Sequence, residues 1–389
     1  MHNTIISHFT DNDLYKFTTM NAVQKLYPHA RVKYRFFDRN ATQFPAGFGE
    51  ALKTEVATMA SLSLTSEEEC FIRQRCYYFD PVFIDLLKGY RYDPSEVSIQ
   101  QRGGELDIEI EGLWYRTVLW EVPLMAMISE LYFRMTGQQA EEVESTAFEK
   151  GLRFKALAAN YSDFGTRRRF SFEVHDKVIQ NLKEASGSNL RGSSNVYLAM
   201  KHHLAPIGTH PHEWFMYHGA HYGYRMANAK GLESWTKVYR GDLGIALTDT
   251  YTTDNFYENF TTEYAKLFDG VRWDSGDPIE FTEKTLAFYR TRRIRPETKT
   301  VVYSDALNLD KVAQIRKFVE GQLLDVYGIG TYLTNDVGVT PLNMVIKMTH
   351  AKRNGEQNYV ETVKLSDVKG KHTGALREIE FCKASLGID

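Results

Sequence analysis

The N-terminal third of the chain mixes helical and strand-like patterns of apolar and polar residues. Residues 14–26 carry apolar side chains at helical spacing behind Thr10-Asp11, which predicts a capped helix that Pro28 ends. Residues 31–37 alternate charged and apolar side chains, the period of a half-buried strand. Similar runs predict three more strands and a helix, at 97–101, 106–111, 114–121 and 123–135. The pattern indicates an antiparallel sheet with helices packed on it.

From about residue 150 to 335 the pattern changes, and apolar strand candidates alternate with amphipathic helices. The strands are predicted at 205–209, 244–248, 270–273, 300–303 and 324–328, and the helices at 253–267, 279–291 and 309–320. Repeated βα units predict parallel strands, in a doubly wound sheet or a TIM-type barrel. The barrel is favoured because one strand after another ends in polar residues, and the strand ends of a barrel share one mouth. These polar ends lie at 208–210, 248–250, 272–275, 304–305 and 328–331.

After about residue 340 the βα alternation stops. Residues 343–349 and 358–365 are strand-like and are separated by a turn at 353–356, which predicts an antiparallel hairpin. Such a hairpin has no place in a parallel ring, so we expect it to return to the N-terminal domain. The expected domains are therefore an α/β domain at 1–122, a barrel at 123–342 and a C-terminal tail at 343–389.

The composition is that of an ordinary globular protein and excludes several classes. The chain has 389 residues, 43% hydrophobic and 25% charged, with a net charge of −3, so no global field favours nucleic acid or an anionic membrane. It lacks an apolar run of the roughly 18 residues that a membrane span needs, and residues 1–9 are too polar for a signal peptide. Cys70, Cys76 and Cys382 form no CxxC pair and indicate reduced thiols in a cytoplasmic protein.

Residues 271–278 form the sharpest local signal, with one arginine and two carboxylates at the end of an apolar strand. Asp277 precedes Pro278, a common arrangement at the start of a helix, and we interpret it as a cap. Arg272 and Asp274 are interpreted as functional, because charged side chains at a barrel mouth need a reason to be there.

The sequence from Gly328 through Gly330 to Thr331 follows another apolar strand. Two glycines allow backbone N–H groups to turn toward a phosphate, and the threonine adds a hydroxyl. A plain strand-to-helix turn is the alternative. No P-loop lysine follows and GxGxxG is incomplete, which disfavours mononucleotide NTPases and dinucleotide enzymes.

Two further clusters stand out, one cationic and one of histidines. Arg167, Arg168 and Arg169 are adjacent, and cations at a helix start are unfavourable unless an anion binds there. Six of the twelve histidines are His202, His203, His210, His212, His218 and His221. They are either metal ligands, or one of them does covalent or acid–base work while the others decorate a helix. The absence of HExxH and of a neighbouring cysteine disfavours the metal site.

Six segments occur in an order that resembles the nicotinate phosphoribosyltransferase family. They are Asp13–Thr18 (DLYKFT), 163–168 (DFGTRR), 192–196 (GSSNV), 208–214 (GTHPHEW), 272–277 (RWDSGD) and 328–331 (GIGT). Pro211 stands where the family more often has alanine, which stiffens that loop. The resemblance implies an irregular TIM-type barrel plus an α/β N-terminal sandwich completed by the C-terminal tail. It also implies a homodimer with shared active sites.

The resemblance further implies the reaction: nicotinate and 5-phosphoribosyl 1-pyrophosphate (PRPP) give nicotinate mononucleotide and pyrophosphate in NAD biosynthesis. ATP is a co-substrate whose hydrolysis is coupled to the transfer, so the enzyme is classified with the ligases, and Mg²⁺ is required. Carboxylates would steady the positive charge that develops on the sugar, while Mg²⁺ and arginine would steady the leaving group.

For the base, the resemblance implies that Phe164 and Tyr15 of the partner subunit sandwich the pyridine ring. Arg167 and Arg272 would lie beside the ring and the ribose phosphates. Ser194 stands where nicotinamide-using relatives carry aspartate, which implies a preference for the acid, since a carboxylate there would repel nicotinate.

For the remaining site, Asp249, Asp274 and Asp305 would face the ribose hydroxyls, with Mg²⁺ held mainly through substrate and by Asp249 or Asp274. Thr209 and Ser304 would also bind substrate, and Gly328, Gly330 and Thr331 would hold the 5′-phosphate. His212 would be the residue that ATP phosphorylates, and the expected catalytic residues are His212, Asp274 and Arg272. His210 is the alternative to His212 as the phosphorylated residue, because the sequence does not say which of the two rings points inward.

Two other functions remain open from the residues alone. A metal-dependent barrel hydrolase would use the histidines between His202 and His221 with Asp249 or Asp274. A non-catalytic nucleotide-binding regulator would keep the phosphate loop without turnover.

Overall fold

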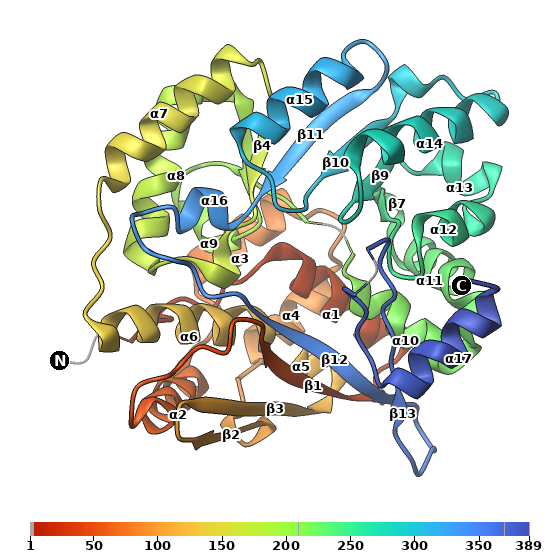
Figure 1. The fold of residues 1–389 in the computed structure, drawn as a ribbon. Helices are drawn as coiled ribbons and strands as arrows, with labels where there is room; N and C mark the ends of the chain where they lie inside the picture. The colour runs from red at the N-terminus through yellow and green to blue at the C-terminus, as the bar shows by residue number, and fades with distance from the viewer. Residues whose placement is uncertain (1–3, 209, 369, 389) are drawn as a thin grey trace.

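The structure is a computed structural model that describes residues 4–208, 210–368 and 370–388. It contains two separate sheets (Figure 1). The first is antiparallel, in the order β13-β12-β1-β3-β2. Its strands are β1 (Arg31–Asp38), β2 (Val97–Arg102), β3 (Glu105–Leu113), β12 (Met344–Lys352) and β13 (Val360–Glu361). The predicted strands at 31–37, 97–101 and 106–111 are therefore confirmed.

The second sheet has seven parallel strands that curl into part of a barrel, in the order β6-β5-β4-β11-β10-β9-β8. These are β4 (Tyr161–Asp163), β5 (Leu190–Ser193), β6 (Ala205–Pro206), β8 (Ile245–Leu247), β9 (Gly270–Trp273), β10 (Thr300–Tyr303) and β11 (Leu324–Ile329). Because all neighbours pair in parallel, their carboxyl ends meet at one edge. The expected fold class, an irregular barrel with an α/β domain completed by the tail, is confirmed.

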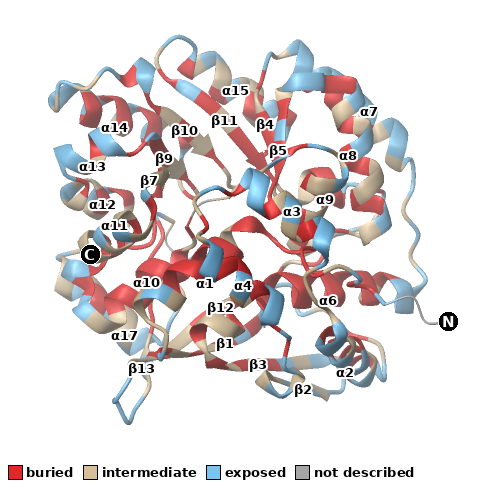
Figure 2. Ribbon diagram, turned by 180° about the vertical axis from the view of Figure 1, so that it is seen from behind, coloured by how far each residue is buried: buried red, intermediate tan, exposed pale blue. Residues whose placement is uncertain are grey.

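Helices cover the outside of the curled sheet and turn their apolar faces toward it. They include α7 (Val143–Ala156), α8 (Phe172–Ser186), α9 (Val196–Lys201), α14 (Pro278–Thr291) and α15 (Leu309–Val319). In α8 the buried residues Val174, Val178 and Leu182 recur at helical spacing. Figure 2 shows the same division, with buried residues on the inner sides of the helices and exposed residues outside.

Helix α1 (Leu14–Leu26) lies in the middle of the molecule, between the two sheets (Figure 1). The backbone N–H of Leu14 donates to the carbonyl of Ser194 at 2.8 Å, at the end of β5. The expected cap at Thr10-Asp11 is wrong. The side chain of Thr10 donates to Glu68 at 2.6 Å and Asp11 pairs with Arg169, so tertiary partners compete successfully for both side chains.

Two other expectations are corrected. Residues 114–121 are not a strand but α5 (Trp114–Thr117) and the start of α6 (Glu121–Thr136). All five residues from 117 to 121 are buried, so no exposed face remains for a strand's alternation. The helix expected at 253–267 is divided into α12 (Thr253–Asn259) and α13 (Thr262–Leu267), because the Thr261 side chain accepts from the N–H of Tyr264 and begins a second helix. The strand expected at 205–209 is much shorter, since β6 covers only 205–206 and residue 209 lies outside the described residues. The other predicted helices and barrel strands are present with small differences in length.

The tail joins the two sheets. Strand β12 pairs antiparallel with β1, with Arg35 opposite Lys347. β13 is much shorter than the strand expected at 358–365, because the chain leaves the sheet after Glu361 and crosses to the barrel mouth, where the N–H of Leu365 donates to the carbonyl of Thr250. The chain ends in α17 (Leu376–Leu386), beside α11 (Tyr224–Tyr239). Among the described residues, no helix is both long and apolar enough to cross a bilayer.

Candidate active site

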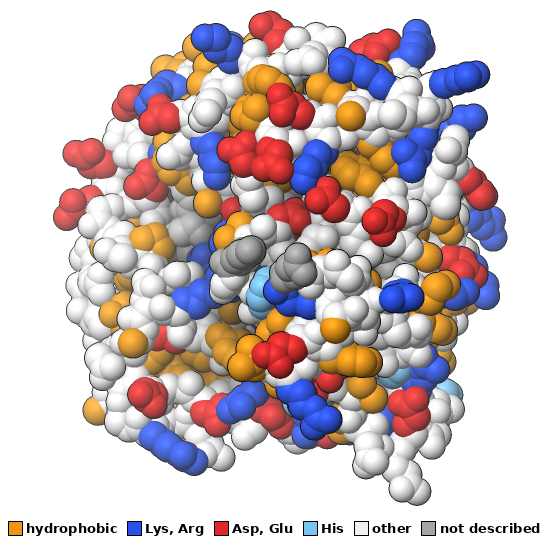
Figure 3. Space-filling view, turned by 45° about the vertical axis from the view of Figure 1, so that its right-hand side comes forward, with side chains coloured by type: hydrophobic (Ala, Val, Ile, Leu, Met, Phe, Trp, Pro, Cys, Tyr) orange, Lys and Arg blue, Asp and Glu red, His pale blue; other side chains and the backbone are white. Residues whose placement is uncertain are grey.

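A cavity of about 690 Å³ opens where the barrel mouth faces the antiparallel sheet. Among the residues that the structure describes, its wall carries seven cationic side chains and five carboxylates. The cations are Arg39, Arg167, Arg168, Arg272, Lys347, Lys364 and Lys371, and the carboxylates are Asp13, Glu121, Glu213, Asp274 and Asp305. Figure 3 shows this hollowed face, with lysine, arginine and histidine side chains gathered at it. A chain of net charge −3 thus concentrates cations at one place, as the binding of an anionic ligand requires.

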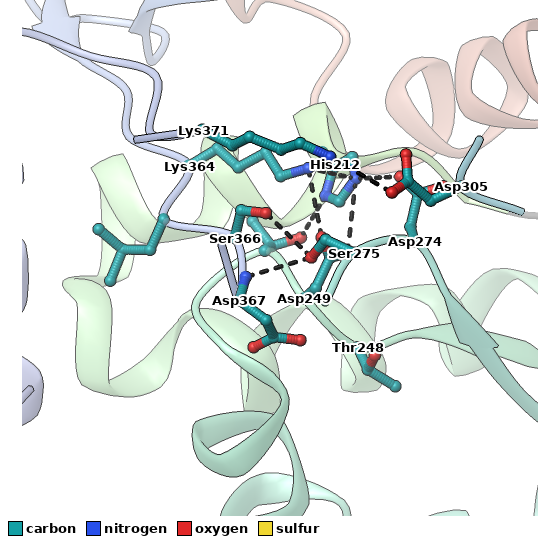
Figure 4. Close-up of polar contacts among 12 residues, drawn as sticks. His212, Thr248, Asp249, Asp274, Ser275, Asp305, Lys364, Ser366, Asp367 and Lys371 are labelled. Atoms are coloured by element: carbon teal, nitrogen blue, oxygen red, sulfur yellow. Dashed lines mark hydrogen bonds and ion pairs between the residues drawn. The ribbon is translucent and has the colours of Figure 1, made fainter. Parts of the chain in front are cut away.

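His212 lies in the cavity wall, at the first position of α10 (His212–Tyr222), and is 9% exposed. Its Nε2 lies 2.9 Å from Asp274 Oδ2 and 2.9 Å from Lys364 Nζ, and its Nδ1 lies 3.0 Å from Thr250 Oγ1 (Figure 4). Asp249 lies behind the ring, with Oδ1 3.6 Å from Nε2. The barrel loops and the tail together fix this imidazole on both nitrogens.

Burial and the Lys364 ammonium lower the pKa of His212, whereas the carboxylates of Asp249 and Asp274 raise it. The net result is a pKa of about 4. Burial alone would raise the pKa of Asp274, but Arg272 and His212 outweigh it and hold that pKa well below its usual value. The pKa of Asp249 is lowered as well, because Lys364 and His212 outweigh its burial. At neutral pH the site therefore presents a neutral imidazole between ionised carboxylates and an ammonium.

A short stretch of the tail holds Lys364 in place. Ser366 donates to Ser275 at 2.9 Å (Figure 4). Asp367 accepts from the N–H and hydroxyl of Thr253 at 2.7 Å each. Lys364 also lies 3.3 Å from Asp249 Oδ2. The sequence did not identify Lys364 as a site residue, because the tail contains no motif that would indicate its passage across the barrel mouth.

Two polar residues at neighbouring strand ends complete this side of the wall. Ser304 donates to Asp274 Oδ1 at 2.7 Å, and Asp274 Oδ2 is the oxygen that lies near His212 Nε2. Asp305 lies 3.3 Å from Lys371, a second cation from the tail. The Nε of Arg272 is buried and has no hydrogen-bond partner among the described residues, so this guanidinium retains a free donor at the wall.

Tyr15, Phe164, Arg167 and Ser194 also line the cavity. Tyr15 and Phe164 of one chain line this cavity together. The expected contribution of the partner subunit's Tyr15 stays a prediction. Helix α1 carries Tyr15 across to the barrel loops, so closely that a Cβ on Gly208 would lie 2.8 Å from the Tyr15 nitrogen.

Ser194 does not face this space alone. Its hydroxyl donates to Asp13 Oδ1 at 2.8 Å, and Asp13 also lines the cavity. Burial raises the pKa of Asp13, although Thr166, Arg167 and Ser194 act to lower it. The sequence placed Asp13 in a matching segment but assigned it no role, and the structure adds a buried carboxyl beside the ring pocket.

Gly328, inside β11, and Gly330, directly after it, have different surroundings. A Cβ on Gly328 would lie 2.3 Å from the Phe164 ring, so Gly328 makes room for that ring and does not line the cavity. Gly330 and Thr331 do line it, at the start of the four-residue helix α16 (Thr331–Thr334). The expected phosphate loop is therefore reduced to Gly330 and Thr331. Thr209 lies outside the described residues.

The six histidines do not converge. His210 packs edge-on against Phe215 and Trp235 in the core, and neither ring nitrogen has a partner among the described residues. His218 contacts the Trp214 carbonyl and the Tyr27 hydroxyl, and His202 pairs with Asp176. Within the described chain, only His212 joins carboxylates in a group that could hold a metal, with Asp249 and Asp274. A metal centre built from several of these histidines is therefore wrong.

The adjacent arginines are also divided in their contacts. Arg169 is fully buried and forms two hydrogen bonds to Asp11, at 2.6 and 2.7 Å, so it is structural. Arg167 lies 3.3 Å from Glu121, and Arg168 donates to the Met344 carbonyl, and both line the cavity. Asp277 accepts from the N–H groups of Ile279 and Glu280, which confirms its interpretation as a cap.

Two family models match the chain. Residues 10–129 match the nicotinate phosphoribosyltransferase N-terminal domain, and residues 159–382 match the nicotinate phosphoribosyltransferase family. A protein from Chromohalobacter salexigens named nicotinate phosphoribosyltransferase is 51% identical over 387 residues, which cover 99% of both chains. One of the same name from Desulforapulum autotrophicum is 48% identical and covers 97% of this chain and 98% of its own.

Solved structures agree with these matches. A nicotinate phosphoribosyltransferase from Porphyromonas gingivalis superimposes with a TM-score of 0.97 at 47% identity, covering 99% of this chain and all of its own. One from Vibrio cholerae superimposes with a TM-score of 0.92 at 30% identity, covering all of this chain and 95% of its own.

Proposed function

Because this chain belongs to the nicotinate phosphoribosyltransferase family, we propose that its cavity transfers the phosphoribosyl group of PRPP to nicotinate, with ATP hydrolysis coupled through His212. The observation that carries the proposal is that two kinds of group line one cavity. Aromatic rings with Arg167 form one set, and a neutral histidine with carboxylates and lysines forms the other.

The aromatic residues of the cavity wall fit the pyridine ring of nicotinate. Tyr15 and Phe164 supply flat faces, and Arg167 supplies positive charge for the nicotinate carboxylate. Ser194 is small and neutral, and its proton is already donated to Asp13. A second carboxylate at position 194 would meet Asp13 and repel an acidic substrate, so we assign the preference for the acid to this position.

The cationic residues of the cavity wall fit the phosphates of PRPP. Lys347, Lys364, Lys371 and Arg272 line the wall, and Gly330 and Thr331 offer a turn and a hydroxyl for the 5′-phosphate. Asp274 faces the cavity and would stabilise the positive charge that develops on the ribose as pyrophosphate leaves. Asp305 and Ser304 follow the next strand and would orient the ribose hydroxyls.

The residues present fit a Mg²⁺ ion that is shared with substrate. Asp249 Oδ1 is buried without a hydrogen-bond partner among the described residues, and Asp274 lies close to it around His212. Lys364 lies 3.3 Å from the other oxygen of Asp249, so the protein offers few free ligand atoms and the phosphates would supply the rest. When bound, the ion would neutralise charge on the leaving pyrophosphate.

His212 is proposed to accept the γ-phosphoryl group of ATP. With its proton on Nδ1 and donated to Thr250, the imidazole has its lone pair on Nε2, where it accepts from Lys364 Nζ. Once the phosphates of ATP take over the Lys364 ammonium, this lone pair can attack the γ-phosphorus. The bond from the γ-phosphorus to the β–γ bridging oxygen breaks and ADP leaves with the electron pair. Water later cleaves the P–N bond and releases phosphate. Lys364, at 2.9 Å, lies where the transferred charge appears.

We further propose a cytoplasmic homodimer that works in NAD salvage. The three cysteines are free thiols, Cys70 exposed and Cys76 and Cys382 buried, as a reducing compartment permits. The dimer rests on the resemblance, and sedimentation velocity of the purified chain tests it.

A single assay tests the function. Formation of the pyridine mononucleotide is followed from PRPP with nicotinate or nicotinamide, each with and without ATP. We expect nicotinate to be used far better and ATP to accelerate the reaction. Binding of PRPP and ATP without any turnover would instead indicate a nucleotide-binding regulator.

A further inference from the structure

Lys16 of α1 is fully buried and lies outside the cavity wall. Its Nζ lies 2.5 Å from Glu121 Oε2 and 2.6 Å from Glu213 Oε1. Burying an ammonium is costly unless it is paired, and here two carboxylates from distant elements pair with it at once. Lys16 therefore ties α6 and α10 to the central helix.

Each of these carboxylates also has a second partner. Glu121 Oε1 lies 3.3 Å from Arg167, the cation of the ring pocket. Glu213 Oε2 accepts from the Tyr34 hydroxyl at 2.6 Å, and Glu213 directly follows His212 in the first turn of α10. Glu121 thus connects Lys16 to the arginine proposed to bind the base. Glu213 connects Lys16 to the histidine proposed to accept the phosphoryl group.

The charges in this cluster balance. Lys16 and Arg167 are cations, and Glu121 and Glu213 are their two counter-ions. Both glutamates line the cavity, yet their nearest cation is the buried Lys16. A buried ionic cluster is often no more stable than apolar residues of the same volume, so its presence at the cavity wall calls for a role besides stability.

We propose that Lys16 is a positioning residue that holds Arg167 against the base through Glu121 and His212 at the mouth through Glu213. The inference rests on the proposed function, since it assigns the two contacts to two substrates of that reaction. Without the ammonium, the two carboxylates face each other uncompensated. Arg167 is then drawn toward them and the first turn of α10 loses its tie to α1.

The test separates the two contacts. We expect Glu121→Gln to raise KM for nicotinate by roughly tenfold while His212 labelling from γ-labelled ATP changes little. Glu213→Gln should do the reverse, slowing the labelling and sparing nicotinate binding. Lys16→Met should impair both. The double variant Lys16→Met/Glu213→Gln removes one charge of each sign and should recover nicotinate binding relative to Lys16→Met.

Lys25→Met is the matched control, since Lys25 lies on the same helix in a partly exposed pair with Asp80. Each variant is checked by its melting temperature and by equilibrium binding of nicotinate, which needs no turnover. Wild-type turnover tests the proposed function separately. Should the two glutamine variants lose both readouts in equal proportion to their melting temperatures, the cluster is merely structural and the proposal fails. It also fails if Lys16→Met binds nicotinate as the wild type does. If Lys16→Met does not fold, the two glutamine variants decide the matter alone.

Discussion

Nζ of Lys364 lies 2.9 Å from Nε2 of His212, although 152 residues separate the two in sequence. The tail brings this lysine to the barrel mouth after leaving the antiparallel sheet, and the contact defines the electrostatics of the histidine. An ammonium beside the ring disfavours the imidazolium and keeps the nucleophilic form populated.

Replacing Lys364 with methionine should therefore change the pH dependence of His212 phosphorylation. The wild-type pKa is about 4, so labelling from ATP should be nearly independent of pH above about pH 5. In Lys364→Met the pKa of His212 rises, because only burial then opposes the carboxylates of Asp249 and Asp274, and labelling should fall on acidification within the accessible range. Labelling rates between pH 5 and 8 measure this. A profile with the same shape as that of the wild type would contradict the assigned role of Lys364.

Replacing His212 with asparagine should abolish acid-labile labelling and PRPP-stimulated ATP hydrolysis, while a slower uncoupled transferase reaction persists. His210→Asn should keep the labelling, because His210 packs in the core against Phe215 and Trp235. That variant should melt at a lower temperature, since it leaves a void and an unpaired amide. Labelling of the His212 variant combined with loss in the His210 variant would reverse the assignment.

Position 194 should control the choice between nicotinate and nicotinamide. In the wild type the Ser194 hydroxyl lies 2.8 Å from Asp13 Oδ1. Ser194→Asp therefore places a second carboxylate beside Asp13 and close to the bound acid. The repulsion should cost on the order of a few kcal/mol in nicotinate binding and narrow or reverse the preference. The ratio of kcat/KM for the two bases measures it, with Ser194→Asn as an uncharged control of similar size. Equal use of both bases by the wild type would already refute the assignment.

Gly328, inside β11, and Gly330, directly after it, allow a matched comparison of alanine substitutions. A Cβ at Gly328 would lie 2.3 Å from the Phe164 ring, whereas one at Gly330 would lie 3.2 Å from the Phe164 carbonyl oxygen. Gly328→Ala should displace the ring and raise KM for nicotinate by roughly tenfold, which is about 1.4 kcal/mol. Gly330→Ala should have a smaller effect on nicotinate. If the two variants bind nicotinate equally well, Phe164 does not stack on the base.

Acid should destabilise the fold below about pH 6.5. Burial lowers the pKa of His210 to about 3 and that of His218 to about 4. The unfolded chain binds these protons between its own pKa and the folded value, so the free energy of unfolding falls as pH drops from about 6.5 toward 4. Urea unfolding at several pH values measures the slope. His210→Leu should reduce it, and an unchanged slope would show that His210 is not buried as a neutral ring.

Several features of this chain follow from sequence pattern alone, because they depend on neighbours in sequence. The strands at 31–37, 270–273 and 300–303 follow from periodicity, and the cap at Asp277 from its proline. Polar residues at successive strand ends predicted one shared mouth, and parallel pairing gathers them there. Six short segments in order were enough to indicate the family.

Tertiary contacts decided the rest. The strand predicted at 114–121 is absent because residues 117–121 are all buried, which removes the alternation that distinguishes a strand. His212 faces the cavity and His210 the core because α10 begins at residue 212, a boundary that two nearly adjacent histidines do not reveal. Lys16 lies in the segment 13–18 that matches the family but was assigned no role there, and Lys364 lies in no such segment. Their roles arise only when α1 lies between the sheets and the tail returns, because charge pairing depends on distance in space and not on separation along the chain.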